Sequence, residues 1–254
     1  MKDLCEKLRV FERIAAGQHV HVLALGDSSV EHFMVGAHWF DYVNIGFMHK
    51  YRKWAADSSS VDNPVLCLNA GISNHTTDEL LARFDRDVAP FKPDLVILSA
   101  GLNDANPRRG VSTERFRANL RELKMRVNDL DGDVLFQTFY YCDTKKLAEV
   151  RLDWLTNLAS YAAIIREAAG ELLVDHFTRW ERLYKHDVAA FRLLMRDYMH
   201  LNPEGNAVIG LDLARALELP IPEENLPWIR GGVFAQKTMD LLEIAEKGNK
   251  CISE

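Results

Sequence analysis

Two short segments, far apart in the chain, carry residue types that together could act as a nucleophile and its base. Ser28 follows a glycine and an aspartate in the stretch ALGDSSVEHF, and His200 stands three residues after Asp197. A serine hydroxyl becomes a nucleophile at neutral pH when a neighbouring histidine removes its proton. A carboxylate about one helical turn before the histidine can orient the imidazole and stabilise its protonated form. These residue types fit nucleophilic catalysis on an acyl group.

Each segment also has a simpler structural interpretation. Ser28 or Ser29 could cap a helix that runs through Trp39, because serine is among the favoured N-cap residues. Asp197 and His200 could form an isolated surface pair. Taken alone, the Gly-Asp-Ser segment favours the helix cap.

Two further polar segments could supply hydrogen-bond donors to the same place. Gly71 lies in the stretch NAGISNHTT, where a glycine can turn the chain and leave its peptide N–H exposed. Asn103 lies in the stretch GLND, and its side-chain amide could point into the same crevice. The alternatives are a turn glycine and an asparagine that stabilises its own loop.

Taken together, these segments resemble the SGNH hydrolases, the GDSL-type esterase and lipase superfamily. That family is recognised by a Gly-Asp-Ser block, a glycine block, a Gly-x-Asn-Asp block and a terminal Asp-x-x-His block, and all four occur here in that order. The stretch NAGISNHTTDELLARFDRDVAPFKPDLVILSAGLND is similar to the family over its full length, and HLNPEGNAVIG resembles the usual continuation after the catalytic histidine. The resemblance covers roughly residues 19 to 217.

The resemblance implies a role for each matching residue. Ser28 corresponds to the nucleophile, His200 to the general base and acid, and Asp197 to the residue that orients the histidine. The peptide N–H groups of Ser28 and Gly71 and the side-chain amide of Asn103 would form the oxyanion hole. Such a site requires no metal and no organic cofactor.

Two positions depart from the family pattern. Asn74 stands where many members have a second glycine, and asparagine tolerates the left-handed backbone conformation that a glycine could hold there. Ser29 stands where the family often has a larger or β-branched residue, which would alter the floor of the pocket.

The rest of the sequence predicts an α/β fold that would bring these segments together. Strands and amphipathic helices alternate, so we expect a three-layer α/β/α fold with a flavodoxin-like, roughly five-stranded parallel sheet. Ligands of such sheets bind at the carboxyl ends of the strands; Ser28, Gly71 and Asn103 follow the first three of those ends, and Asp197 and His200 come before the C-terminal end of the domain. Apolar runs predict strands at residues 19–25, 64–69, 94–100, 133–139 and 171–176, of which the second, third and fifth are expected to be buried on both faces. Amphipathic segments predict helices at residues 77–88, 113–127 and 158–169.

The N-terminal segment predicts a further amphipathic helix that docks on this fold. Leu4, Leu8, Phe11 and Ala15 recur at helical spacing. Charged residues are scattered through the first thirteen positions, so the segment lacks the uninterrupted apolar stretch of a secretory signal. We therefore expect a cytoplasmic protein.

A domain boundary is expected near Glu218, where the stretch LELPIPEENLPW brings three prolines. We expect an SGNH-hydrolase domain over residues 1–218 that includes the N-terminal helix. Residues 219–254, with a predicted helix over 233–247, would form an extension packed on the domain or on a partner subunit. The sequence leaves open whether this segment forms a homo-oligomer.

Composition excludes several classes of function. The chain has 31 basic and 37 acidic residues, a formal charge of −6, and an acidic body repels the phosphates of nucleic acids. No apolar run approaches the length of a membrane span. The phosphate-binding, dinucleotide-binding and zinc-protease motifs are absent, so we expect neither cofactor nor metal. The Gly-x-Ser-x-Gly elbow of the α/β-hydrolases is absent as well.

The resemblance leaves the substrate open, since the family spans lipases, thioesterases, short-chain esterases and carbohydrate deacetylases. Without an evident hydrophobic lid, short acyl groups are favoured, including O-acetyl groups on carbohydrate. Two alternatives stay open: an acyltransferase that uses the same Ser28 and His200, and a catalytically silent, flavodoxin-like binding protein. The tryptophans are expected in the core, with stacking on a sugar as the alternative; they are Trp39, Trp54, Trp154 and Trp180.

Overall fold

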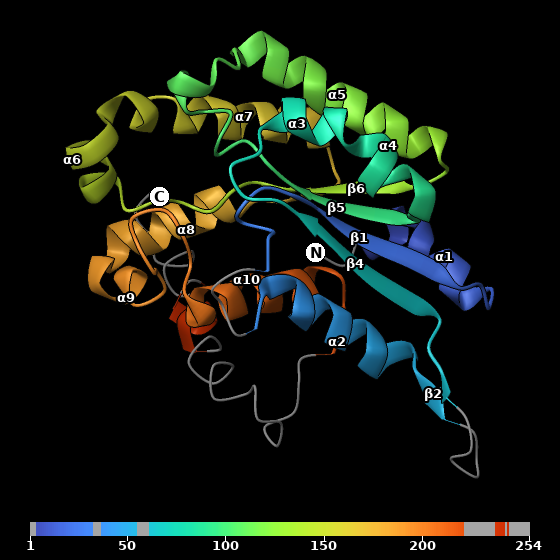
Figure 1. Ribbon diagram of the computed structural model, residues 1–254. Helices are drawn as coiled ribbons and strands as arrows, with labels where there is room; N and C mark the ends of the chain where they lie inside the picture. Colours follow the sequence, from blue (N-terminus) through green and yellow to red (C-terminus); the bar gives the residue numbers. More distant parts are fainter. Residues whose placement is uncertain (1–3, 33–36, 55–60, 221–236, 242, 244–254) are drawn as a thin grey trace, which may run out of the picture.

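A five-stranded parallel sheet forms the centre of the molecule (Figure 1). The computed structural model describes residues 4–32, 37–54, 61–220, 237–241 and 243. The strands of the sheet are β1 (Val20–Gly26), β4 (Val65–Gly71), β5 (Leu95–Ser99), β6 (Asp133–Gln137) and β7 (Leu173–Val174); a separate antiparallel ribbon pairs β2 (Lys53–Trp54) with β3 (Val61–Asp62). The order across the sheet is β4-β1-β5-β6-β7 and every neighbouring pair is parallel. This flavodoxin-like order confirms the predicted fold class.

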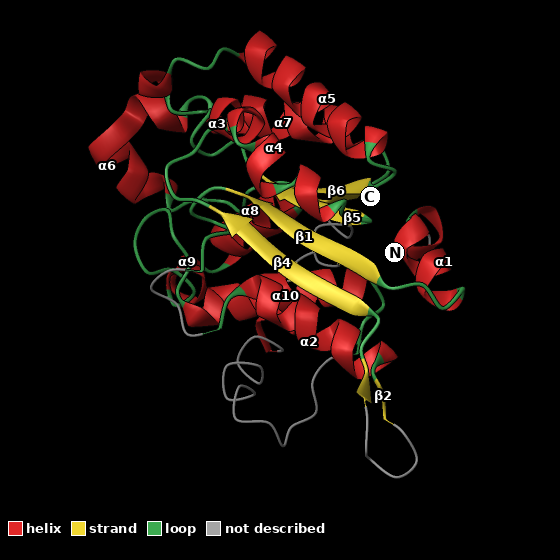
Figure 2. Ribbon diagram, turned by 45° about the vertical axis from the view of Figure 1, so that its right-hand side comes forward, coloured by secondary structure: helices red, strands yellow, loops and turns green. Residues whose placement is uncertain are grey.

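Helices cover both faces of the sheet (Figures 1 and 2). One layer contains α3 (Thr77–Ala82), α4 (Phe84–Asp87), α5 (Thr113–Asp129), α6 (Thr144–Leu155) and α7 (Leu158–Ala169). The opposite layer contains α2 (Trp39–Tyr51), α8 (His176–His186), α9 (Val188–Arg192) and α10 (Pro203–Ala216). Short 3₁₀ helices occur at Cys5–Lys7, Ala89–Phe91 and Pro107–Arg109. The predicted helices at 113–127 and 158–169 are α5 and α7, whereas the one predicted at 77–88 is interrupted at Arg83 into α3 and α4.

Alternate residues of the central strands pack into two separate cores. In β1, Val22 and Ala24 contact the cluster that contains α2 and α10, while Leu23 and Leu25 contact the cluster that contains α5 and α7. Successive side chains of a strand point to opposite faces, and both faces of this strand are covered by helices. A continuous apolar run is therefore the pattern that β1 requires.

The prediction that three strands are buried on both faces holds only for β5, whose five residues are all buried. β4 is an edge strand of the sheet, so the helix layers cover it incompletely and Leu66 is 51% exposed. β7 is the outer strand on the other side, has two residues, and leaves Leu173 partly exposed. An apolar run in the sequence does not tell an outer strand from an inner one.

The N-terminal helix α1 (Arg9–Ala15) packs on the domain as predicted, with a shifted buried face. Leu4 and Leu8 are buried, and Val10 and Ile14 complete the face in place of Ala15, which is exposed. The 3₁₀ helix that precedes α1 changes the helical register, so regular spacing did not predict the buried set.

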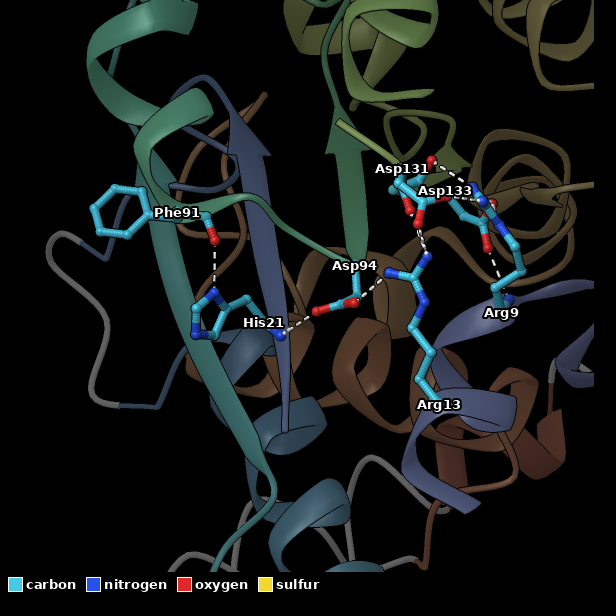
Figure 3. Close-up of polar contacts among 8 residues, drawn as sticks. Arg9, Arg13, His21, Phe91, Asp94, Asp131 and Asp133 are labelled. Carbon is cyan, nitrogen blue, oxygen red and sulfur yellow. Dashed lines mark hydrogen bonds and ion pairs between the residues drawn. The ribbon is translucent and has the colours of Figure 1, made fainter. Parts of the chain in front are cut away.

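Arginines of α1 bind the amino ends of the three central strands (Figure 3). Arg13 pairs with Asp94, just before β5, and Asp94 also accepts the backbone N–H of His21 in β1 at 2.7 Å. Arg9 binds Asp133, the first residue of β6, through Nε at 2.9 Å and Nη2 at 2.8 Å. One helix thus connects β1, β5 and β6 at the edge of the sheet opposite the carboxyl ends.

The residues described beyond α10 contact the domain. Met239 is 1% exposed and belongs to the cluster around α2 and α10, and Glu243 lies 3.4 Å from Arg215 of α10. Much of the predicted helix at 233–247 lies outside the described residues, so the role of the extension stays a prediction. None of the helices described has the length and apolar character to cross a membrane.

We expect the substitution Asp94→Ala to lower the free energy of unfolding by about 1–3 kcal/mol, because it leaves the His21 N–H without its acceptor and removes one of the two carboxylates that bind Arg13, the other being Asp131. Urea denaturation followed by circular dichroism measures the change. Asp85→Ala is the matched control, since Asp85 also pairs with an arginine, Arg126, but is 82% exposed. The control should change stability by less than about 0.5 kcal/mol, and equal losses in the two variants would contradict the role given to Asp94.

Candidate active site

The carboxyl ends of three neighbouring strands converge on one site. Ser28 lies in the turn after β1, the segment 72–75 follows β4, and Asn103 follows β5. Parallel strands end at the same edge of a sheet, so these three loops lie together. Asp197 and His200 come from the segment between α9 and α10, and the fold brings them to the same edge.

Ser28, His200 and Asp197 form a continuous hydrogen-bonded chain. Ser28 Oγ lies 3.2 Å from Nε2 of His200, although the two residues are 172 positions apart in the sequence. The other ring nitrogen, Nδ1, lies 2.9 Å from Oδ2 and 3.1 Å from Oδ1 of Asp197. The structure therefore brings together the three residues that the sequence proposed as a triad.

Asp197 is ionised at neutral pH because hydrogen bonds to its carboxylate outweigh its burial. Burial raises the pKa of Asp197, but the His200 ring and the backbone N–H groups of Met199 and His200, each at 2.8 Å, hold that pKa well below its usual value. A carboxylate that faces Nδ1 keeps the proton of the neutral imidazole on that nitrogen. Nε2 can therefore accept the proton of the Ser28 hydroxyl.

The loop that carries the histidine is held on both sides. Before it, the backbone N–H of Arg196 donates to the carbonyl of His200 at 2.8 Å. After it, the Asn202 side chain accepts the N–H of Gly205 at 2.9 Å and caps α10, and Pro203 occupies the first turn of that helix. The sequence HLNPEG thus combines the histidine with the start of a helix, which fixes its position.

The two serines of the opening segment have different environments. Neither caps α2, because that helix begins at Trp39 and its N-cap is His38. Ser28 faces His200, whereas Ser29 Oγ lies 3.1 Å from Ser99 Oγ at the end of β5. The helix-cap interpretation is therefore wrong for both.

The turn around Ser28 leaves its backbone N–H open. The carbonyl of Asp27 accepts the N–H groups of Val30 and Glu31 at 3.0 and 2.9 Å, and its side chain accepts that of Ser29 at 2.8 Å. Within the part of the chain that the structure describes, the N–H of Ser28 has no hydrogen-bond partner. Asp27 is 1% exposed, and burial raises the pKa of its carboxyl group.

Gly71 has a packing role in this structure. Its N–H, which we predicted to face a ligand, donates to Oδ1 of Asn69 at 2.9 Å. A Cβ at this position would lie 2.2 Å from the backbone nitrogen of Glu31, so only glycine fits where β4 passes the Ser28 turn. Farther along the same loop, Asn74 has a φ of 65°, and its N–H is unbonded among the described residues. Asn74 thus offers the open N–H that Gly71 does not.

Asn103 lies between the Ser28 turn and the loop after β4. Its side-chain Nδ2 donates to the carbonyl of His75 at 2.9 Å and lies 3.4 Å from Oδ2 of Asp27. Trp154 holds the loop of Asn103 from behind, since its indole N–H donates to the carbonyl of Leu102 at 2.8 Å. The side-chain amide of Asn103 therefore contacts Asp27 and His75, the chain neighbours of Ser28 and Asn74, whose N–H groups are open.

A second buried carboxyl group follows Asn103. Asp104 accepts the N–H of Thr77 at 3.0 Å and the Thr77 hydroxyl at 2.5 Å, so it connects the start of α3 to the loop after β5. Its other oxygen, Oδ2, has no hydrogen-bond partner among the described residues. Burial raises the pKa of Asp104 to about 7.

Several residues that support the site were missed by sequence reasoning. The carbonyl of Ser29 accepts the indole N–H of Trp39 at 2.7 Å and Nε2–H of His38 at 3.1 Å. Burial lowers the pKa of His38 to about 4, so its ring is neutral at pH 7 and donates from Nε2. No motif marks these residues.

The core interpretation of the tryptophans is confirmed for Trp39, Trp154 and Trp180, while the Trp54 side chain lies outside the description.

Ser28 and His200 open on a small pocket. The volume that the centre of a water molecule can occupy in this pocket is about 20 Å³. Its lining is Ser28, Ser29, Glu31, His38, Tyr140, Arg196, His200, Leu201 and Asn206. Among the described residues, no group of three or more His, Cys, Asp or Glu side chains could hold a metal ion, and the expectation of no cofactor stays a prediction.

A serine hydroxyl that faces a histidine at the carboxyl ends of a flavodoxin-like sheet is the arrangement expected of an SGNH-type hydrolase. The chain belongs to the GDSL-like lipase/acylhydrolase family, whose model matches residues 24–208, and the resemblance stated above is confirmed. It is 26% identical to an acetylxylan esterase of Geobacillus stearothermophilus over 174 residues, which are 64% of this chain and 74% of the esterase. It is 36% identical to the uncharacterized lipoprotein YqeF of Bacillus subtilis (strain 168) over 106 residues, 39% of this chain and 40% of the lipoprotein.

Solved acetylxylan esterases share the fold. The crystal structure of Axe2 from Geobacillus stearothermophilus matches with a TM-score of 0.64 at 19% identity, covering 82% of this chain and 98% of that one. The acetyl xylan esterase AlAXEase matches with a TM-score of 0.63 at 20% identity, covering 78% and 100%. At these identities the likeness establishes the architecture and leaves the substrate open.

We expect a fluorophosphonate to form its adduct on Ser28, because the Ser28 hydroxyl faces His200 whereas that of Ser29 faces Ser99. Peptide mass spectrometry locates the adduct. The substitution Ser28→Ala should abolish labelling, and the matched control Ser29→Ala should retain it. An adduct on Ser29 would contradict the assignment.

We also expect Asp104 to make the stability of the protein depend on pH. Its carboxyl group has a pKa of about 7 in the folded chain against 3.8 as the ordinary value, so the folded state holds the proton more tightly. Its contribution to stability is therefore largest at low pH and falls as the pH rises from about 4 to about 7. Asp104→Asn cannot ionise, so its unfolding free energy relative to wild type should increase between pH 5 and pH 8. Urea denaturation at the two pH values measures this, and an unchanged difference would contradict the raised pKa.

Proposed function

We propose that the protein is a serine esterase that hydrolyses short-chain esters, including O-acetyl groups on carbohydrate, through an acyl intermediate on Ser28. The observation that carries the proposal is the chain of contacts from Ser28 Oγ through His200 to Asp197, at 3.2 and 2.9 Å. Family membership and the similarity to acetylxylan esterases support it. Catalytic mutants of Axe2 replace a serine, and an aspartate and a histidine three positions apart, the spacing seen here.

The proposed reaction uses His200 twice. Nε2 takes the proton of the Ser28 hydroxyl as its oxygen attacks the ester carbonyl, and then gives that proton to the departing alcohol. Water next attacks the acyl-serine while His200 accepts its proton; His200 then gives that proton to Ser28 Oγ as the acyl–oxygen bond breaks, which releases the carboxylic acid and restores Ser28. Ionised Asp197 stabilises the imidazolium formed in each step.

The proposed oxyanion hole consists of the N–H groups of Ser28 and Asn74 and the side-chain amide of Asn103. Asn74 replaces Gly71 in this role, because the Gly71 N–H already donates to Asn69. The 3.4 Å contact of Asn103 with Asp27 is long for a hydrogen bond, so a negatively charged substrate oxygen can compete for that N–H. Loss of one such donor costs typically about 3 kcal/mol of transition-state stabilisation.

The pocket beside Ser28 favours a small acyl group. The centre of a water molecule can occupy about 20 Å³ of this pocket. One ordered water needs roughly 10–15 Å³ on the same measure, so the pocket holds about one. Buried Tyr140 and Leu201 limit its depth, and neither can move without disturbing the core. An acetyl methyl group fits such a space better than an extended alkyl chain does.

We expect kcat/KM to be at least about tenfold higher for p-nitrophenyl acetate than for p-nitrophenyl octanoate, because the extra methylenes find no cavity. We also expect acetate release from acetylated xylooligosaccharides, and Ser28→Ala should remove both activities. Faster hydrolysis of the octanoate would contradict the small acyl pocket.

Two other results would redirect the proposal. A new ester formed when an acceptor alcohol is added would identify an acyltransferase that uses the same site. No hydrolysis across a panel of esters, together with no fluorophosphonate adduct, would identify a catalytically silent binding protein. The cytoplasmic location expected from the N-terminal sequence stays a prediction, which cell fractionation tests.

A further inference from the structure

A buried arginine connects the strand ends that carry the site. The side chain of Arg83, between α3 and α4, is 5% exposed. Its Nη2 donates to the carbonyl of Gly26 at 2.9 Å and to the carbonyl of Ala70 at 2.8 Å. These carbonyls lie at the carboxyl ends of the paired strands β1 and β4, and Gly26 is two residues before Ser28. Arg83 thus holds the starting points of two site loops.

The same guanidinium group also reaches the loop after β4. Its Nε donates to Nδ1 of His75 at 3.1 Å, and the carbonyl of His75 accepts Nδ2 of Asn103 at 2.9 Å. His75 directly follows Asn74, whose open N–H is a proposed oxyanion donor. The position of two donors therefore depends on where Arg83 holds His75.

The remaining contact of Arg83 compensates its charge. Nη1 pairs with Asp87 at 2.9 Å, one helical turn further along the chain. A buried cation requires such a partner and hydrogen bonds for its other N–H groups. The planar guanidinium group of Arg83 thus donates to four acceptors, and the single ammonium of a lysine cannot reproduce this arrangement.

We infer that Arg83 is a positioning residue that holds the oxyanion hole in shape, through the Gly26, Ala70 and His75 contacts. Its catalytic consequence rests on the esterase function proposed above. Among the described residues Arg83 makes no hydrogen bond or ion pair with Ser28 or His200, so it acts through the loops and leaves both side chains in place. The physical basis is that a donor displaced by about 1 Å from a developing oxyanion can lower the rate on the order of a hundredfold.

The test compares Arg83→Met and Arg83→Lys with wild type on p-nitrophenyl acetate. We expect both to lower kcat by about tenfold to a hundredfold, with KM within about threefold, because the transition state loses more than the bound substrate does. Arg126→Met is the matched control. Arg126 donates to the carbonyl of Leu81 in α3 and to the carboxylate of Asp85 in α4. Its substitution should therefore lower the melting temperature without lowering kcat.

A double substitution separates positioning from general destabilisation. In the Asn103→Ala background, one of the donors positioned by Arg83 is absent, so Arg83→Met should lower kcat much less than it does in wild type. Its effect on the melting temperature should persist. Equal effects on kcat in both backgrounds, or an unchanged kcat in Arg83→Met, would overturn the inference.

Hydrogen–deuterium exchange tests the positioning without any activity. We expect Arg83→Met to speed exchange of a peptide covering residues 70–76, and Arg126→Met to leave it unchanged. His75→Ala keeps the contacts of Arg83 with the carbonyls of Gly26 and Ala70 and should also speed exchange in this peptide. This variant replaces Arg83→Met in the test if Arg83→Met does not fold. If wild type hydrolyses no ester, the proposed function fails, while faster exchange still supports the positioning and unchanged exchange overturns it.

Discussion

The parallel pairing of β1 with both β4 and β5 is the constraint on which the site depends. In this register Gly26 lies opposite Gly71 on one side and Ser99 on the other, so three loops leave the sheet at the same level. Glycine at position 71 allows β4 to pass the turn of the first loop at van der Waals distance. The loops that carry Ser28, Asn74 and Asn103 lie close together because of this pairing, although they are far apart in sequence.

Buried polar groups then hold the loops at that edge. Asp27, Asn103, Asp104 and Arg83, which lies between α3 and α4, are each less than 10% exposed. Unsatisfied polar groups are costly in a low-dielectric interior, so the hydrogen bonds that these groups make to the surrounding loops favour one arrangement of the loops. The raised pKa values of Asp27 and Asp104 show that burial disfavours their charged forms. Perturbed pKa values of this kind are common at functional sites.

Much of the fold, and the contacts that join Ser28, His200 and Asp197, could be predicted because their signals are local or form a recognisable set. The apolar runs located the five strands, and the Ser28, Asp197 and His200 blocks identified the chain of contacts that the structure contains. Prediction failed where a residue's role depends on its neighbours in space. An apolar run could not reveal that β4 is an outer strand, and a glycine could not reveal that its N–H would be bonded to Asn69.

The sequence by itself therefore determined the class of protein, the order of its elements and the proposed triad of Ser28, His200 and Asp197, because periodicity and short motifs record backbone preference and chemistry directly. Only the tertiary structure decided which N–H groups stay open, how small the pocket beside Ser28 is, and that Arg83 binds the ends of β1 and β4. These properties arise from contacts between segments that are distant in the chain. Hydrogen bonds and packing of that kind have no short-range signature in the order of the amino acids.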